Sequence, residues 1–202
     1  SILKKISLQK KKIIGYFPTY RKTSKDMFID FENEQELLDL NKILVKNKTI
    51  IVFKLHQNSF REDKSESFNI ENEKFNSFIS ELSNFIGLDY ECDVNSILSN
   101  CDLIVSDYSG IVLDYLYVNK PIIFYCPDLD EYKKTPGLAL DIEKQDFAYL
   151  AKNKHEFFEF LNQYFEDKDK FEGFHGTQRN NMLNNFFPKE NNFKEIKKIL
   201  NN

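Results

Sequence analysis

The stretch C-D-L-I-V-S-D-Y-S-G-I-V-L-D-Y, residues 101–115, places hydroxyls, an acid and a glycine between two apolar segments. Residues 102–106 form a short apolar run, which predicts a buried strand. Residues 110–118 return to apolar residues at helical spacing, which predicts a helix. The polar turn at 106–110 therefore joins a strand to a helix, the connection found in βαβ units.

Apolar runs on either side of this stretch extend the same pattern. Residues 84–88 could add a short strand, although residues 75–79 compete for that role. Short buried strands that alternate with helices predict an α/β fold, a Rossmann-like parallel sheet with helices on both faces. The other predicted strands are 13–18 (I-I-G-Y-F-P), 49–55 (T-I-I-V-F-K-L) and 121–125 (P-I-I-F-Y), and further helices are 32–46 and 94–100, the latter N-capped by Asp93.

Beyond residue 150 the pattern becomes helical, with Phe and Leu along one side of each segment. We expect residues 1–150 to form the Rossmann-like core, and residues 151–202 to form a helical extension packed on the same domain. The segment G-F-H-G-T-Q-R, residues 173–179, has the composition of a flexible polar loop. The predicted helices of the extension are 154–166, 178–186 and 193–200.

The composition is that of a soluble globular protein with room for one domain: 202 residues, 41% hydrophobic and 30% charged. A net charge of −4 argues against nucleic acid as a partner. Three cysteines form no C-x-x-C pair, which favours reduced thiols and a cytoplasmic location. No apolar run has the length of a membrane span.

Residue 1 is Ser, and residues 2–8 resemble the last turn of a longer element, so we expect a fragment of a larger protein.

Polar residues follow four of the predicted strands. Ligands of open parallel sheets bind beyond the carboxyl ends of the strands, and parallel neighbours bring those ends to one edge. We therefore expect the four groups to line one candidate site. In chain order they are Thr19, Tyr20 and Arg21; Lys54, Leu55 and His56; Ser106, Asp107, Tyr108, Ser109 and Gly110; and Asp128 with Glu131.

The turn at 106–110 could bind an anion, because the first N–H groups of the following helix lie at the positive end of its dipole. Ser109 would add a hydroxyl, and Gly110 would let a phosphate approach the backbone closely. The alternative is that Ser106, Asp107 and Ser109 only cap the helix, which these residue types do well. The spacing by itself does not separate binding from capping.

His56 is a candidate for phosphate recognition or proton transfer, because it follows a strand end and Lys54 precedes it by two residues. A histidine in an ordinary surface loop would have the same sequence context. No spacing of His and Cys fits a metal site, and no glycine-rich nucleotide motif occurs. We therefore expect neither a metal nor a cofactor.

The block of residues 95–132 resembles the CDP-glycerol glycerophosphotransferases, the teichoic-acid and capsule polymerases that have a two-domain GT-B fold. Its core is similar to their patterns S-D-x-L-I-T-D-Y-S-S, D-Y-L-x-x-x-K-P-I-I-F and P-D-L-x-x-Y. Residues 13–21 are similar to the family's I-L-Y-A-P-T-W-R, and residues 54–56 to its R-L-H-P. The resemblance covers residues 1–145 well and the helical tail loosely.

The resemblance implies that the chain is the donor-binding, C-terminal half of a GT-B transferase, with residues 1–150 as its nucleotide-binding core. A hydroxyl of a glycerol-phosphate or glycan polymer would attack the β-phosphate of CDP-glycerol or a related CDP-activated donor, and CMP would leave. The family's N-terminal half, with a further histidine and the acceptor site, would be missing. The isolated fragment would therefore be inactive, and the full-length protein would lie peripherally on the inner face of the cell membrane.

The resemblance also implies roles for individual residues. His56 matches the family histidine that engages the pyrophosphate, and it is the implied catalytic residue. Asp107 would orient a neighbour or accept a hydrogen bond from a hydroxyl, because a carboxylate repels phosphate. The residues expected to bind the donor nucleotide and its phosphates are Thr19, Arg21, Lys54, Ser106, Asp107, Ser109, Gly110, Asp128 and Glu131.

Three departures from the family pattern leave the donor open. Gln57 replaces a proline, Gly110 replaces the second serine of the turn, and residues 189–196 lack the serine and arginine of the family's D-G-x-A-S-x-R. The donor could carry ribitol phosphate, or another activated polyol or sugar. Two alternatives remain: a GT-B glycosyltransferase that uses a nucleotide-sugar, and a non-catalytic α/β interaction module.

Overall fold

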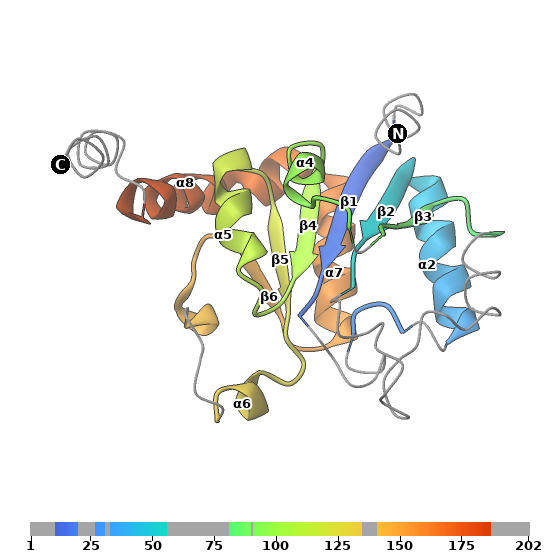
Figure 1. Ribbon diagram of the computed structural model, residues 1–202, viewed down its shortest axis with the longest axis horizontal. Helices are drawn as coiled ribbons and strands as arrows, with labels where there is room; N and C mark the ends of the chain where they lie inside the picture. Colours follow the sequence, from blue (N-terminus) through green and yellow to red (C-terminus); the bar gives the residue numbers. More distant parts are fainter. Residues whose placement is uncertain are drawn as a thin grey trace.

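The strands of the computed structural model form one sheet in the order β3-β2-β1-β4-β5-β6, and every neighbouring pair is parallel (Figure 1). The structure describes residues 11–19, 27–30, 33–55, 81–89, 91–134 and 141–186. The prediction of a Rossmann-like parallel sheet is confirmed. The strands are β1 (Lys12–Phe17), β2 (Thr49–Phe53), β3 (Phe85–Gly87), β4 (Leu103–Ser106), β5 (Ile122–Tyr125) and β6 (Tyr149–Ala151).

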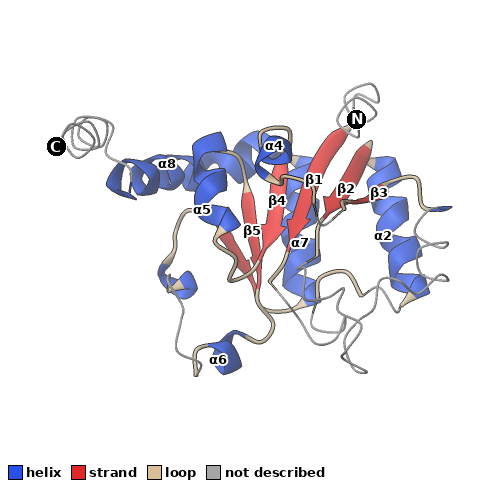
Figure 2. Ribbon diagram, viewed as in Figure 1, coloured by secondary structure: helices blue, strands red, loops and turns tan. Residues whose placement is uncertain are grey.

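Helices cover both faces of the sheet (Figure 2). The helices α2 (Glu34–Lys46) and α7 (Lys154–Glu166) bury their apolar side chains in the core on one face. The core on the other face receives α4 (Asn95–Leu98), α5 (Ile111–Tyr115) and the 3-10 helix η3 (Leu116–Val118). The remaining helices are α6 (Leu129–Tyr132), η4 (Ile142–Lys144) and α8 (Lys168–Phe186), of which α8 contacts α7 and η3.

The strands β2, β4 and β5 are buried along their whole length, which explains why they are continuous apolar runs rather than alternating ones. In β1, successive side chains point to opposite faces of the sheet and pack in different cores. Ile14 and Tyr16 belong to the core beneath α2 and α7. Ile13 and Phe17 belong to the core beneath α4 and α5. The sheet is therefore held between two apolar layers, and its carboxyl edge is fixed in place.

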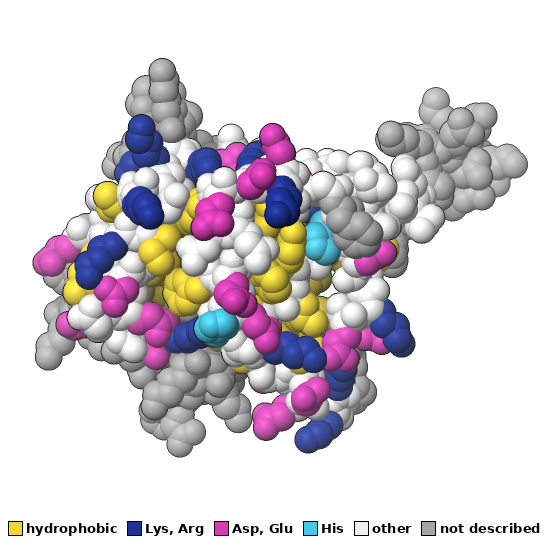
Figure 3. Space-filling view, turned by 180° about the vertical axis from the view of Figure 1, so that it is seen from behind, with side chains coloured by type: hydrophobic (Ala, Val, Ile, Leu, Met, Phe, Trp, Pro, Cys, Tyr) yellow, Lys and Arg dark blue, Asp and Glu magenta, His cyan; other side chains and the backbone are white. Residues whose placement is uncertain are grey.

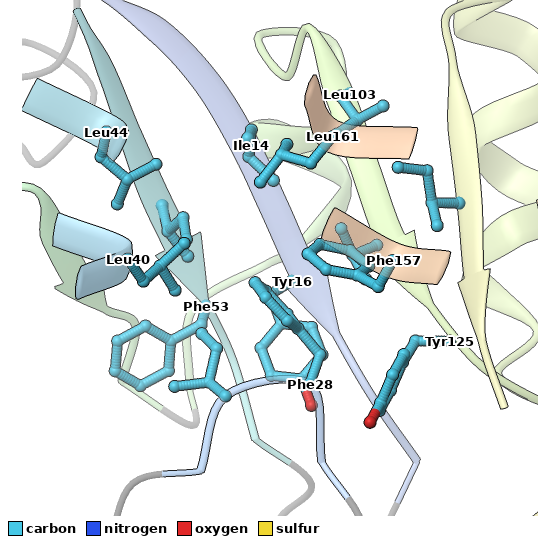
Figure 4. Close-up of a cluster of buried hydrophobic side chains, with 14 of the residues drawn as sticks. Ile14, Tyr16, Phe28, Leu40, Leu44, Phe53, Leu103, Tyr125, Phe157 and Leu161 are labelled. Atoms are coloured by element: carbon cyan, nitrogen blue, oxygen red, sulfur yellow. The ribbon is translucent and has the colours of Figure 1, made fainter. Parts of the chain in front are cut away.

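The loop between β1 and α2 contributes a short buried segment, residues 27–30, that the sequence patterns did not predict. Its first three side chains are at most 5% exposed. The Phe28 ring packs on Phe157 of α7 with a centroid separation of 4.1 Å, and it lies edge-on to Tyr16 and Tyr125 (Figure 4). Phe28 therefore fixes the loop that follows β1 to the core, close to the carboxyl ends of β1 and β5.

The predicted loop at 173–179 is wrong, because these residues lie inside α8. Two glycines and several polar residues favour a loop in isolation. Arg179, which is 1% exposed, anchors the helix instead. Its guanidinium donates to Oδ1 of Asn119 and to the carbonyl oxygen of Phe147, both at 3.3 Å, and it pairs with Glu172. These tertiary contacts override the local preference.

Other predicted boundaries agree with the structure to within a few residues. The strand predicted at 84–88 is β3, and the helix predicted at 110–118 is α5 followed by η3. The helix predicted at 178–186 is the last part of α8. The strand β6 was not predicted from the sequence. The segments 75–79 and 193–200 lie outside the described residues.

Gly15 lies within β1, where a Cβ would be 2.5 Å from Cε2 of Phe17 and 2.9 Å from Sγ of Cys101. We expect Gly15→Ala to lower the free energy of unfolding by about 1–3 kcal/mol, because Phe17 and Cys101 are packed in the core beneath α4 and α5. Urea unfolding measures this change. Gly110→Ala is the matched control, since a Cβ there meets nothing within 4 Å, and equal losses in both variants would contradict the explanation.

The surface carries charges of both signs on the side opposite to the view of Figure 1, interspersed with small hydrophobic areas (Figure 3). Large exposed hydrophobic side chains of the described ranges are Leu38, Val45 and Tyr117. Such scattered apolar groups are normal for a globular domain. Within those same ranges, no helix combines the length and the hydrophobicity needed to cross a bilayer.

Candidate functional site

The candidate site lies where the winding of the sheet reverses. From the centre, the strands run through β1, β2 and β3 on one side, and through β4, β5 and β6 on the other. Ligands of doubly wound sheets bind in the crevice at this switch point, outside the carboxyl ends of the strands. Thr19 follows β1 and Asp107 follows β4, so these two residues lie on either side of the switch point. Lys54 and Asp128 follow β2 and β5, the next strands outward, so the described members of the predicted polar groups share one edge.

Asp107, which is 4% exposed, connects the residues that follow β4 to those that follow β1. Its carboxylate accepts hydrogen bonds from the backbone N–H of Thr19 at 2.8 Å and from Oγ1 of Thr19 at 2.9 Å. Beside this pair, Oγ of Ser106 donates to the carbonyl oxygen of Phe17 at 2.7 Å. The prediction that Asp107 accepts from a hydroxyl is confirmed. These bonds direct the side chains of Ser106 and Asp107 toward Phe17 and Thr19, the residues at the end of β1.

The second half of the turn, Ser109 and Gly110, faces the start of α5. Ser109 is partly buried, and its Oγ accepts from the N–H of Ile111 at 3.4 Å, a long and weak contact. Gly110 is exposed, makes no side-chain cap and has a φ of −62°, which any residue can adopt. A side chain at Gly110 would point into open space. The serine that the family has at this position would therefore fit without strain.

Lys54 contributes a cationic group to the same edge. Its Nζ donates to the carbonyl oxygen of Cys92 at 2.5 Å, which connects the end of β2 to the loop before α4. Lys54 is partly buried, so its charge lies at the border between the protein and the solvent. The other predicted basic residues, Arg21 and His56, lie outside the described residues, as does Tyr20.

On the β5 side, the turn contacts the segment that contains α6. The Tyr108 hydroxyl donates to Oδ1 of Asp128 at 2.9 Å. The Tyr108 and Tyr132 rings stack with a centroid separation of 3.6 Å and an interplanar angle of 13°. Glu131 is exposed on the same helix. The sequence placed Tyr108 in the polar group after β4 but gave it no role in the site, and it did not identify Tyr132, although Tyr132 ends the quoted motif P-D-L-x-x-Y.

A second group of contacts fixes the far end of α6. Lys133, the residue after α6, pairs with Glu143 of η4, and Glu143 also pairs with Lys152, which follows β6. The hydrogen bonds from Lys133 and Lys152 lower the pKa of the Glu143 carboxyl to about 2. Glu143 therefore remains ionised in ordinary buffers, and the ion pair holds α6 near the end of β6.

This arrangement suits an anionic ligand. The start of α5 offers backbone N–H groups, Ser109 offers a hydroxyl, and Lys54 offers a cation at the same edge. Asp107 and Asp128, which would repel an anion, both accept hydrogen bonds from hydroxyls of the protein. Within the described ranges, no three His, Cys, Asp or Glu side chains converge on a point that could hold a metal ion.

Comparison with known families gives one match that covers almost the whole chain. Residues 1–192 match the family described as CDP-Glycerol:Poly(glycerophosphate) glycerophosphotransferase. The match includes both flanks of the crevice and the α6 segment. It confirms the resemblance that was drawn from residues 95–132.

Curated relatives of the chain are longer proteins of teichoic acid synthesis. The teichoic acid poly(ribitol-phosphate) polymerase of Bacillus spizizenii is 27% identical over 178 residues, which cover 80% of this chain and 26% of the relative. The teichoic acid glycerol-phosphate primase of Bacillus subtilis is 32% identical over 138 residues, which cover 66% of this chain and 30% of the relative. The chain therefore spans less than a third of either relative.

Solved structures share the fold of the chain. A structure of the wall teichoic acid polymerase TagF soaked with CDPG superposes with a TM-score of 0.62 and 21% identity, over 95% of this chain and 44% of that one. The Anabaena protein HepE in complex with UDP-glucose superposes with a TM-score of 0.57 and 11% identity, over 99% of this chain and 51% of that one. At these identities the superpositions establish the α/β fold, which agrees with the prediction.

Proposed function

The chain belongs to the CDP-glycerol:poly(glycerophosphate) glycerophosphotransferase family, and we propose that it is the part of such a transferase that binds the CDP-activated donor. The observation that carries this proposal is the position of the Ser106–Gly110 turn, at the switch point of the sheet and before the first turn of α5. A diphosphate placed there meets N–H groups and hydroxyls that match its charge.

In this proposal the donor is CDP-glycerol or a related CDP-polyol such as CDP-ribitol, because relatives of the chain are named for glycerol phosphate and for ribitol phosphate. The residues proposed to surround its nucleotide and phosphates are those predicted from the sequence. Asp128 and Glu131 would line the β5 side, and Asp107 would hold Thr19 in place. The remaining members are Thr19, Arg21, Lys54, Ser106, Ser109 and Gly110.

The proposed reaction is a phosphoryl transfer that needs positioning and charge neutralisation more than covalent help. A hydroxyl oxygen of a glycerol-phosphate or glycan polymer bonds to the β-phosphorus of the donor. The bond between that phosphorus and the bridging oxygen breaks, and the bridging oxygen leaves with its electron pair as part of CMP. The proton of the attacking hydroxyl passes to a base of the further domain or to water. His56 is the proposed catalytic residue of this chain, acting on the pyrophosphate. No metal takes part in the proposed step.

The proposal assigns residues 1–150 to the nucleotide-binding core and residues 151–202 to an extension of the same domain. The packing of α7 on β5 and β6, and of α8 on η3, supports this assignment. The acceptor and the second half of the active site would be supplied by a further domain, so the 202-residue chain would bind donor without turnover. We propose that the full-length transferase works in the cytoplasm, peripherally at the inner face of the cell membrane, where its acceptor polymer is extended.

Thermal unfolding of the chain with CDP, CMP, UDP and GDP tests the proposal. We expect CDP at about one hundred times its Kd to raise the Tm by about 5–10 °C, because binding to the folded state alone adds about 2.7 kcal/mol to its stability.

Ser109→Ala should weaken CDP binding about 10- to 100-fold through the loss of a hydroxyl that contacts phosphate. His56→Ala should also weaken it. Ser99→Ala is the matched control, since Ser99 is exposed and lies before β4 at the opposite edge.

The other outcomes of this experiment identify the alternatives. A Tm that rises with UDP or GDP, but not with CDP, would replace the proposal by a glycosyltransferase that uses a nucleotide-sugar. A Tm that none of the four nucleotides changes would contradict donor binding by this chain and favour a non-catalytic module.

A further inference from the structure

Two parts of the sequence meet at the β5 side of the candidate site. Tyr108 belongs to the turn after β4, whereas Asp128 and Tyr132 belong to the segment after β5. The Tyr108 ring stacks on Tyr132 at 3.6 Å, and its hydroxyl donates to Oδ1 of Asp128 at 2.9 Å. One side chain therefore makes both a ring contact and a polar contact to α6. We call Tyr108, Asp128 and Tyr132 the tyrosine clip.

The α6 helix depends on such contacts for its position. It has four residues, too few for a helix that is stable by itself, and it lies away from the sheet (Figure 1). Of its own side chains only Leu129 is buried. The tyrosine clip attaches α6 to the turn, and the Lys133–Glu143 ion pair attaches its other end to η4. Tyr108 is the member of the clip that belongs to the turn itself.

The Tyr108 hydroxyl also affects the electrostatics of the site, because it contacts the charged side chain of Asp128. A carboxylate at the edge of a diphosphate site repels the ligand, and the repulsion increases with the charge of the ligand. The hydrogen bond from Tyr108 satisfies one carboxylate oxygen and fixes the direction of the side chain. The same solution occurs at Asp107, whose carboxylate accepts from Thr19. Asp107 and Asp128 are thus both held by neutral hydroxyl donors of the protein.

We infer that Tyr108 is a positioning residue of the donor site: its hydroxyl fixes the direction of the Asp128 carboxylate and weakens, without removing, its repulsion of the diphosphate, and its ring holds α6 against the turn. This inference rests on the proposed function where it concerns the nucleotide. Its structural part, the attachment of α6, is independent of any ligand. Removal of the hydroxyl should therefore weaken the binding of highly charged nucleotides more than that of neutral nucleosides.

Isothermal titration of the 202-residue chain with CDP, CMP and cytidine tests the electrostatic part. Tyr108→Phe keeps the ring and removes the hydroxyl, and we expect about tenfold weaker CDP binding, a smaller loss for CMP and none for cytidine. If the lost affinity comes from repulsion by the Asp128 carboxylate, a higher salt concentration should reduce the loss in Tyr108→Phe, because salt screens charges near the surface. Tyr117→Phe, at a 60% exposed position of η3, should bind CDP like the wild type at both salt concentrations. Equal losses for all three ligands, or a loss for CDP that salt does not reduce, would overturn the electrostatic role.

Hydrogen exchange without nucleotide tests the attachment of α6 separately. We expect faster exchange across residues 128–134 in Tyr108→Phe than in Tyr117→Phe, with unchanged exchange in β1 and β4. Unchanged exchange in residues 128–134 would overturn the attachment, whatever the titrations show. If the wild type binds no cytidine nucleotide, the proposed function and the electrostatic role both fail, and the exchange rates still decide whether Tyr108 positions α6.

Discussion

Phe28→Ala is expected to lower the free energy of unfolding by about 3–5 kcal/mol, the usual cost of removing a fully buried aromatic ring. Phe28 is 1% exposed and packs on Phe157 at 4.1 Å, with Tyr16 at 5.2 Å and Tyr125 at 6.3 Å. Its removal leaves a cavity bounded by α7 and by two strands, which cannot collapse without a shift of the sheet. Urea unfolding followed by circular dichroism measures the loss.

The position of Phe28 adds a functional consequence to this loss. Because Phe28 anchors residues 27–30 close to the carboxyl ends of β1 and β5, its removal should also weaken CDP binding, even where the protein remains folded. Phe158→Ala is the matched control, since Phe158 is a partly buried phenylalanine of α7 at the border of the same core. A loss in Phe158→Ala as large as that in Phe28→Ala would contradict a special role for residues 27–30.

Asp107→Ala should be the most damaging change at the candidate site. It leaves the N–H and the hydroxyl of Thr19 without their acceptor, and we expect a loss of about 2–4 kcal/mol in the free energy of unfolding. CDP binding should fall below detection, because the two sides of the crevice are no longer joined. Denaturant unfolding and titration calorimetry measure the two effects.

Two further variants separate the contributions at Asp107. Thr19→Val removes the hydroxyl and keeps the N–H, so it should lose about half as much stability as Asp107→Ala. Asp169→Ala removes an exposed carboxylate from the first turn of α8 and should change neither quantity measurably. Full stability in Asp107→Ala would show that the hydrogen bonds to Thr19 do not support the fold.

The sheet could be predicted from the sequence because its central strands are buried on both faces. Such strands appear as continuous apolar runs, and the runs at β1, β2, β4 and β5 are separated by polar or helical segments. The strand β6 has only three residues, two of them partly buried, and gives no comparable signal. The run of residues 173–179 has the composition of a loop, and only the burial of Arg179 against Asn119 and Phe147 explains why it is helical.

The candidate site could be predicted in part. Topology placed Thr19, Lys54, Asp107 and Asp128 at one edge, because parallel strands end together. The sequence could not separate helix capping from ligand binding at Ser106 and Asp107, since both uses favour the same residue types. The tyrosine clip was beyond prediction, because its members become neighbours only when the strands β4 and β5 pair.

The strand order also has a consequence for synthesis of the protein. The strand β1 lies at the centre of the sheet and pairs with β4 on one side. Phe17 of β1 cannot pair with Ser106 until Ser106 has been synthesised, 89 residues later in the chain. At about 5–20 residues per second, one edge of β1 remains unpaired on the ribosome for roughly 4–18 seconds. An unpaired apolar edge is a template for wrong pairing. The strand order that places the switch point between β1 and β4 thus makes the yield of folded protein depend on how quickly the ribosome completes β4.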